Sequence, residues 1–382
     1  MPQKPLSVTD LVSPAWCELQ YWFTLTKFGR KPQTQAMKQG SKVHRILEEQ
    51  IHTTVPVRVE SKEDKFGLKI WNTIQGLRTL KETGLTRELE VWGVINGQVV
   101  NGIIDEISYN CPDPEMEEVL RKKAEKNGGT LSFGQLNIEQ NLTGNTSVWP
   151  ESLGLERQVY IADVKTRGIK SLPTGVSLRP TWMQLMLYRK LLESLSLNTV
   201  DAETIFARYN LRPLEPFSTV FMREVESIGD ETSNTVVEAG SKNPLMLADM
   251  FEKNANPFST LQAIEIQAHN CLLALWSLMI SEFSQTISMF SDILRAEFRY
   301  SKTGEIIGSS LIIYDEKVIQ DYIDKSMQWW GGEREAQGVE IEEAFKCGMC
   351  NFADQCRWRQ AKVEEALEKS RLRSKVNGKS TV

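Results

Sequence analysis

Hydrophobic and polar residues recur along this chain with the periods of both helices and strands. Residues 34–52 predict an amphipathic helix. One face of this helix carries Gly40, Val43, His44, Leu47 and Ile51. Residues 87–109 form two strand-like runs, separated by Asn96-Gly97, a strong signal for a two-residue hairpin turn. Because His44 lies on the apolar face of the predicted helix, we expect it to point inward. In the second predicted strand, Asp105 ends the apolar run.

A second block of alternation lies in VYIADVKTR (159–167), which predicts another strand. The segment 179–195 follows it as a helix that is apolar on nearly every side, and we expect this helix to be buried against a sheet. A strand followed by a crossover and a buried helix indicates an α/β fold.

The remaining segments complete this organisation. We predict a strand at 205–211, a helix at 263–285, a hairpin formed by 293–300 and 305–314, and a helix at 315–332. Residues 110–157 are polar and look like an insertion that contains one charged helix, and residues 215–262 are polar and irregular. The basic tail 361–382 is expected to be disordered.

Composition narrows the class of protein. The 382 residues are 41% hydrophobic and 25% charged, which is typical of a soluble globular protein. The longest apolar run, 271–280, is too short to cross a bilayer, and the opening residues lack the apolar segment of a signal peptide. We therefore expect an intracellular protein that does not contact a membrane. The net charge of −5 means that any surface for nucleic acid must be local.

Three of the six cysteines form the triplet Cys347-x2-Cys350-x5-Cys356 near the C-terminal end. A tetrahedral metal site or an iron–sulfur cluster normally needs four protein ligands, so this triplet is one ligand short. Cys17 is the candidate for the fourth, because it lies in a segment rich in large aromatic residues that should pack firmly against another element. The other two cysteines, Cys111 and Cys271, fit a loop thiol and a buried small hydrophobe.

Ligand type and spacing favour an all-cysteine [4Fe–4S] cluster, because no histidine lies near the triplet in sequence. Structural zinc usually takes its ligands as two short pairs, which this pattern does not match. Zinc stays open as the alternative.

The candidate chemistry lies on the predicted strands. Side chains alternate along a strand, so Asp163 and Lys165 emerge on the same face, and Asp105 can converge on them if the two strands pair. Two carboxylates and the Val164 carbonyl would suit Mg²⁺. Lys165 would then stabilise an attacking hydroxide and the charge that develops on phosphorus. An isolated D-x-K triplet is more often an exposed ion pair, so the assignment depends on the whole set of residues.

Taken together, these motifs resemble the iron–sulfur branch of the PD-(D/E)xK nuclease superfamily, and most closely the exonuclease V family. The similar segments are SVTDLVSPAWCELQ, GSKVH, RELEV, NGIIDE, ADVKTR, QLMLYR and GVEIEEAFKCGMCNFADQC, which together span nearly the whole chain. The resemblance implies a restriction-endonuclease-like α/β core with a mixed central sheet flanked by helices. It also implies that a [4Fe–4S] cluster on Cys17, Cys347, Cys350 and Cys356 joins the two ends of a single nuclease domain, residues 1–360.

The resemblance also assigns roles to individual residues. It makes Asp105 and Asp163 metal ligands, Lys165 the catalytic lysine, and His44 and Glu88 further members of the site, with one or two Mg²⁺ ions that Mn²⁺ can replace. The family often has Glu where Asp163 stands, and either residue satisfies the motif. The residues expected to contact DNA are Gln184, Tyr188, Arg167, Lys170, Arg179 and Arg189.

The expected activity is that of an exonuclease specific for single-stranded DNA, 5′-directed by the resemblance, in DNA replication or repair. We expect a monomer in the nucleus or mitochondrion, with a single-strand-binding protein as a partner, and an arch formed by residues 215–290 over the site. The alternative is a non-catalytic nucleic-acid-binding scaffold with structural zinc. The presence of Asp105, Asp163 and Lys165 argues against it, because a decayed nuclease would have lost at least one of them.

Overall fold

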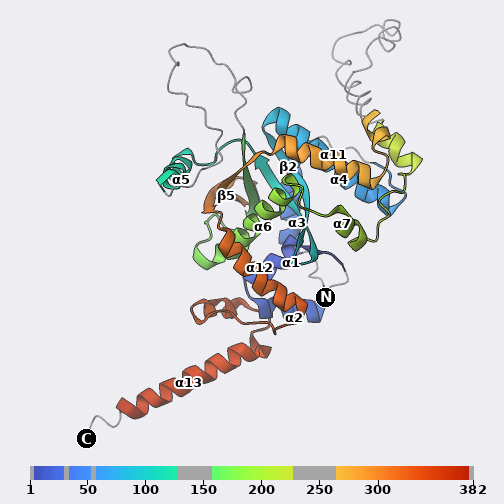
Figure 1. Ribbon diagram of the computed structural model, residues 1–382. Helices are drawn as coiled ribbons and strands as arrows, with labels where there is room; N and C mark the ends of the chain where they lie inside the picture. The colour runs from blue at the N-terminus through green and yellow to red at the C-terminus, as the bar shows by residue number, and fades with distance from the viewer. Residues whose placement is uncertain (1–3, 30–33, 53–56, 127–156, 227–263, 378–382) are drawn as a thin grey trace, which may run out of the picture.

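A mixed β-sheet forms the centre of the computed structural model, which describes residues 4–29, 34–52, 57–126, 157–226 and 264–377 (Figure 1). Within these ranges the sheet has six strands in the order β1-β3-β4-β5-β6, with β2 also paired to β3. The strands are β1 (Leu6–Ser7), β2 (Leu85–Ile95), β3 (Gln98–Ser108), β4 (Gln158–Arg167), β5 (Met289–Tyr300) and β6 (Ile306–Ile313). The β1/β3 and β4/β5 pairs are parallel and the other pairs are antiparallel. The predicted α/β class with a mixed sheet flanked by helices is therefore confirmed.

The helices of the described ranges pack on this sheet or extend from it. They include α1 (Val8–Val12), α2 (Glu18–Phe28), α3 (Gln35–Glu48), α4 (Lys62–Thr83), α5 (Pro114–Lys126), α6 (Arg179–Ser196), α7 (Ala202–Arg208), α11 (Leu272–Thr286), α12 (Glu316–Gly331) and α13 (Arg357–Asn377). The α4 and α11 helices lie side by side, and α6 lies against β2, β4 and β5 (Figure 1). One contiguous hydrophobic core includes residues from Leu6 to Met327.

The predicted hairpin is present as β2 and β3. Asn96 and Gly97 have φ values of 46° and 75°, the left-handed conformation that a tight turn between twisted antiparallel strands requires. The α3 helix begins after Thr34, whose side chain accepts a hydrogen bond from the Met37 amide. The predicted strand at β4, the buried helix α6, the β5–β6 hairpin and the helix α12 are also confirmed.

The prediction of a strand at 205–211 was wrong, because most of this segment belongs to helix α7. Asp201 caps the helix by accepting hydrogen bonds from the Glu203 and Thr204 amides, at 3.3 and 3.1 Å. Ile205 and Phe206 are then buried together. An apolar run this short does not by itself distinguish a strand from a buried helix.

The predicted helix at 263–285 is interrupted before α11. Asn270 accepts a hydrogen bond from the Phe217 amide at 2.8 Å, and Cys271 forms a β-bridge with Pro216. These long-range backbone contacts take the place of helical ones, so α11 starts only at Leu272.

The prediction of a disordered tail was wrong for residues 361–377, which belong to helix α13. The helix points away from the rest of the protein in Figure 1. Its sequence is rich in Ala, Glu, Lys, Arg and Leu, which favour helix even without tertiary packing. Lys362 and Glu365 add an ion pair at 3.0 Å one turn apart.

The predicted arch, residues 215–290, includes the described helix α11 and a long stretch outside the described residues. Its helical part, α11, belongs to the core: Trp276 is only 3% exposed, and its ring lies 6.0 Å from that of Trp92 and 5.6 Å from that of Phe206. The interpretation of α11 as part of an arch was therefore wrong. The rest of the prediction falls largely on 227–263, outside the described residues, as does the part of the insertion after α5.

Candidate active site and cysteine cluster

Asp105 is held between β3 and β4. The antiparallel pair of Glu106 with Ala162 brings the preceding Asp105 next to β4, where its Oδ2 accepts a hydrogen bond from the Val164 amide at 2.7 Å. The residue is only 9% exposed. Burial and the neighbouring charge of Asp163 raise the pKa of Asp105 to about 7. The convergence of the two predicted strands at Asp105 and Asp163 is confirmed.

Asp163 and Lys165 form an ion pair on the face of β4 that Asp105 also faces. The Lys165 Nζ lies 2.9 Å from Asp163 Oδ1 and 2.8 Å from Oδ2. Asp163 is fully buried, and its Oδ2 accepts no well-formed hydrogen bond. Burial lowers the pKa of Lys165, but the Asp163 and Asp105 carboxylates outweigh this effect, so its pKa is raised. The site therefore holds a charged ammonium against a buried carboxylate, whose Oδ2 contacts the ammonium but accepts no hydrogen bond of good geometry.

Gln184 on α6 completes the contacts of the lysine. Its Oε1 accepts a hydrogen bond from Lys165 Nζ at 2.9 Å, and its Nε2 donates one to Tyr188 Oη at 3.0 Å. Gln184 thus connects helix α6 to the lysine of β4.

His44 approaches the same centre from α3. Its Nδ1 lies 3.0 Å from Glu88 Oε1 and 3.6 Å from Asp105 Oδ1, and its Nε2 lies 3.1 Å from the Val164 carbonyl oxygen. The hydrogen bond to Glu88 raises the pKa of His44 despite its burial. Among the described residues, His44, Glu88 and Asp105 are the only histidine, cysteine or acidic trio whose ligand atoms all lie within 4.8 Å of one another.

Two backbone features allow His44 and Glu88 to reach this position. A Cβ atom at Gly40, one turn before His44, would lie 3.0 Å from Thr166 Oγ1, so glycine lets α3 approach β4 closely. Glu88 has a φ of 52°, a conformation that non-glycine residues rarely adopt and that costs on the order of 1 kcal/mol. Strain of this kind concentrates at functional sites.

The residues predicted to contact DNA fall into two groups. Gln184, Arg167, Lys170 and Arg179 are at least partly accessible. Lys170 pairs with Glu305 at 2.8 Å, and Arg167 lies 6.0 Å from the centre of the Phe298 ring. For these four residues, contact with DNA stays a prediction.

The prediction of DNA contact was wrong for Arg189 and Tyr188, because both side chains are buried. The Arg189 guanidinium lies 4.3 Å from the centre of the Phe290 ring and 2.9 Å from Glu193. Tyr188 lies below Gln184, against Gly102. The burial of both residues agrees with the apolar pattern of α6, which places most of that helix in the core.

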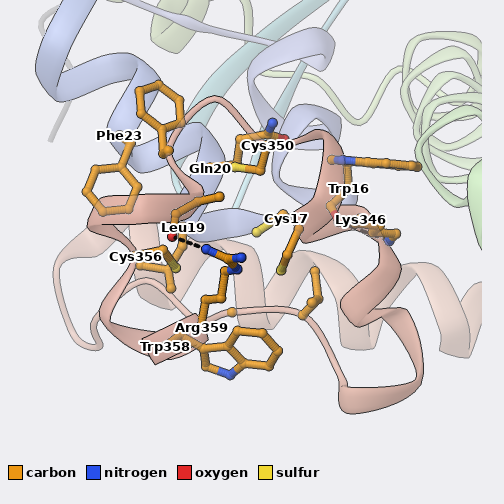
Figure 2. Close-up of a pocket in the computed structure, with 15 residues that line it drawn as sticks. Trp16, Cys17, Leu19, Gln20, Phe23, Lys346, Cys350, Cys356, Trp358 and Arg359 are labelled. Carbon is orange, nitrogen blue, oxygen red and sulfur yellow. Dashed lines mark hydrogen bonds between the residues drawn. The ribbon is translucent and has the colours of Figure 1, made fainter. Parts of the chain in front are cut away.

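The four predicted ligand cysteines line one pocket, although Cys17 is 330 positions before Cys347 (347 minus 17). Figure 2 shows Cys17, Cys350 and Cys356 around this pocket, with Trp358 and Arg359 at its border. Cys17 is the N-cap residue of α2, and Cys347 lies in the 3₁₀ segment Ile341–Met349. All four thiols are free and half-buried. The structure thus brings both ends of the chain together at the cysteines.

A chain of ion pairs that the sequence did not predict lies on the opposite face of the sheet. Glu106 pairs with Arg295 at 2.7 Å and also with Arg87, and Glu297 pairs with Arg299 at 2.6 Å. The small Ala162 side chain lies between Glu106 and Arg295 in the register and lets them meet across β4. The charged alternation in RAEFR (295–299) was the available signal.

The fold and the site define the chain as an α/β protein with a lysine-bearing acidic centre suited to a hard cation. Over residues 1–359 the chain matches the family described as exonuclease V, a 5′ deoxyribonuclease, and it belongs to that family. Family membership indicates a nuclease that acts on DNA as an exonuclease.

Individual relatives agree with this assignment. The chain is 25% identical over 358 residues to the exonuclease V of Danio rerio, an alignment that covers 93% of this chain and 70% of the relative. It is 23% identical over 476 residues to the mitochondrial exonuclease V of Candida albicans (strain WO-1), covering 97% of this chain and 76% of the relative. The mitochondrial exonuclease V of Kluyveromyces lactis is 26% identical over 450 residues, covering 93% and 75%.

None of the helices in the described ranges combines the length and apolar character needed to span a membrane.

Proposed function

We propose that this protein is a metal-dependent exonuclease specific for single-stranded DNA that hydrolyses phosphodiester bonds from the 5′ end. The single observation that carries the proposal is the convergence of Asp105, Asp163 and Lys165 at one point of the sheet, where both carboxylates are buried. A PD-(D/E)xK core, with the acidic residues on two adjacent strands and the lysine two residues after the second aspartate, is the fold that this arrangement supports.

The residues present fit one or two Mg²⁺ ions. Asp163 Oδ2 is buried and lies 2.8 Å from Lys165 Nζ, but it accepts no hydrogen bond of good geometry, which leaves it able to coordinate a cation. Burial and then the neighbouring Asp163 charge raise the pKa of Asp105, although Lys165 and His44 act in the opposite direction, and a bound cation would favour the ionised form further. Asp105, Asp163 and the Val164 carbonyl would hold the first ion, and His44 with Glu88 would contribute to the same or a second ion. When bound, Mg²⁺ or Mn²⁺ supplies positive charge that polarises the phosphate and activates water.

The protein's own residues have distinct roles in this proposal. Lys165 places a positive charge where negative charge develops during cleavage, and the Asp163 carboxylate keeps that ammonium charged and oriented. Gln184 fixes the other side of the ammonium. Glu88 holds His44 through a 3.0 Å contact, so the imidazole cannot rotate away from Asp105.

We further propose that Cys17, Cys347, Cys350 and Cys356 hold a [4Fe–4S] cluster. The four half-buried thiols line one pocket, and none of the residues that line it is a histidine. This supports an all-cysteine cluster over the paired ligands that structural zinc usually takes. The cluster would cross-link the two ends of the single nuclease domain, residues 1–360.

The metal content of the cysteine site can be tested directly. Freshly purified protein is expected to be brown, with broad visible absorption and about four iron atoms per chain, because thiolate-bound iron–sulfur clusters absorb in the visible region. The measurement is an absorption spectrum together with iron and zinc analysis of the same sample. Colourless protein with one stoichiometric zinc would contradict the cluster and support a structural zinc site.

The substrate and direction of cleavage need a second experiment. We expect Mg²⁺-dependent digestion of an end-labelled single-stranded oligonucleotide, little digestion of the duplex, and protection when the 5′ end is blocked. The control is the same oligonucleotide with the 3′ end blocked, which should be digested normally. Equal protection by either block would contradict the proposed direction, and no digestion in Mg²⁺ or Mn²⁺ would favour a non-catalytic nucleic-acid-binding scaffold.

The names of the relatives support one part of the proposed cellular setting, the mitochondrial location. Two of the compared yeast proteins are named as mitochondrial. We propose a mitochondrial or nuclear protein, active as a monomer in DNA replication or repair, which encounters single strands covered by a single-strand-binding protein.

A further inference from the structure

A buried group of ion pairs lies between the cysteine cluster and the candidate active site. The Glu343 carboxylate contacts Lys346 Nζ at 2.6 Å through Oε2, and both of its oxygens contact the Arg179 guanidinium. The side chains of Glu343 and Lys346 are 5% and 2% exposed, whereas that of Arg179 is 40% exposed. Ion pairs this deeply buried are coupled strongly to their surroundings, because losing one partner leaves a buried charge uncompensated.

These three residues connect segments that are distant in sequence. Lys346 precedes the cysteine Cys347, and its Nζ donates a hydrogen bond to the Trp16 carbonyl oxygen at 3.0 Å and lies 4.5 Å from the centre of the Trp16 ring. Trp16 in turn precedes Cys17. Figure 2 shows Trp16 and Lys346 next to each other on one side of the cysteine pocket. Lys346, which pairs with Glu343, therefore contacts the backbone next to Cys17 and is itself the neighbour of Cys347 in the chain.

Arg179 lies at the other end of the group, as the first residue of α6. No side chain caps the start of this helix. Five residues further along, Gln184 accepts the hydrogen bond from Lys165 Nζ. A change in the position of the first two turns of α6 would therefore move the group that orients the lysine of the active site.

We propose that Glu343 is a positioning residue that couples the cysteine cluster to the active site through Arg179 and helix α6. The inference rests on the proposed function, since it concerns the same cleavage reaction. Glu343 touches neither the cysteines nor the acidic centre in this arrangement. It fixes the start of α6 to the segment Ile341–Met349, which contains Cys347. An intact cluster would in this way maintain the hydrogen bond between Lys165 and Gln184.

Two simpler roles must be distinguished from this one: DNA binding by Arg179, and a purely structural link between the chain ends by Glu343. If the main role of Arg179 were to bind a phosphate of DNA, its loss would weaken DNA binding, whereas in this structure Glu343 contacts its guanidinium through both carboxylate oxygens. If Glu343 only held the chain ends together, it would resemble Arg334, which contacts Glu18 at 2.6 and 2.7 Å next to Cys17. Arg334 thus links the same two ends and has no contact with α6 among its hydrogen bonds. It is the matched control.

The experiment compares Glu343→Gln, Arg179→Gln, the double variant and Arg334→Gln, each as the full chain with its cluster. Cleavage of a labelled single strand is measured as kcat and KM per iron-loaded molecule, and DNA affinity is measured in Ca²⁺. We expect kcat to fall about tenfold in both single variants, the range of measured coupling between packed elements. The kcat of the double variant should be no lower than that of either single variant. In all three variants, KM, DNA affinity and iron content should stay near those of the parent. Arg334→Gln should keep the parent kcat per iron.

Several outcomes would overturn the inference. If KM rises in Arg179→Gln while kcat is unchanged, Arg179 contacts DNA directly. If cleavage falls only in proportion to lost iron, Glu343 is a structural link like Arg334. If the single effects multiply in the double variant, the two residues do not act as a unit. Failure of the parent protein to cleave would instead contradict the proposed function, which keeps the two failures distinct.

Discussion

Lys165→Ala is expected to reduce cleavage of single-stranded DNA by at least about a hundredfold, the scale seen when one preorganised electrostatic group is lost. The reason is that the ammonium is already oriented by Asp163 and Gln184, at 2.9 Å from each, so no other group can replace it without rearrangement. Asp163→Ala and Asp105→Ala should have effects of similar size. Folding, brown colour and affinity for the strand in Ca²⁺ should stay nearly intact, because these residues act on the transition state.

The measurement pairs an equilibrium binding titration in Ca²⁺ with digestion in Mg²⁺ of the same labelled oligonucleotide. Lys190→Ala is the matched control, since Lys190 is also a lysine paired with a carboxylate, that of Glu316, but lies outside the acidic centre. Cleavage by Lys165→Ala at the parent rate would mean that Asp163 and Lys165 form only a structural ion pair.

Cys17→Ala should lower iron content, thermal stability and DNA binding together. Cys17 is the cysteine that connects the N-terminal segment to the triplet near the C-terminus, 330 positions away from Cys347. By chain entropy alone, closing a loop of this length is worth on the order of 5 kcal/mol, which is comparable to the whole stability of many proteins. The measurement is iron analysis with thermal unfolding of the same preparation.

Cys271→Ala provides the control for this change. Cys271 is also a half-buried free thiol at a helix N-cap, and neither it nor Cys17 makes a side-chain capping hydrogen bond. It does not line the cysteine pocket. Cys271→Ala should keep the parent iron content. Normal iron and normal stability in Cys17→Ala would remove Cys17 from the ligand set.

The sequence by itself determined the elements whose signals are local. The Asn96-Gly97 turn predicted the β2–β3 hairpin because its backbone twist matches that of paired strands. Strand alternation placed Asp163 and Lys165 on one face, and helical spacing turned His44 inward. The aromatic-rich segment around Cys17, together with family resemblance, was enough to select Cys17 from the three remaining cysteines as a neighbour of the triplet.

Tertiary structure decided the features that depend on contacts between distant segments. The run at 205–211 became helical because Asp201 caps it and the core covers its apolar side, which periodicity over seven residues does not reveal. Arg189 is buried because the Phe290 ring and Glu193 accommodate its charge, although in sequence it looked like a basic residue available to DNA.

Helix α13 shows the opposite case, because local propensity was sufficient for order where charge had suggested disorder. The contact of Glu343 with Arg179, 164 positions apart, has no local signal at all. A buried charge is satisfied by whatever partner the fold brings to it, so such partners become visible only when the chain has folded.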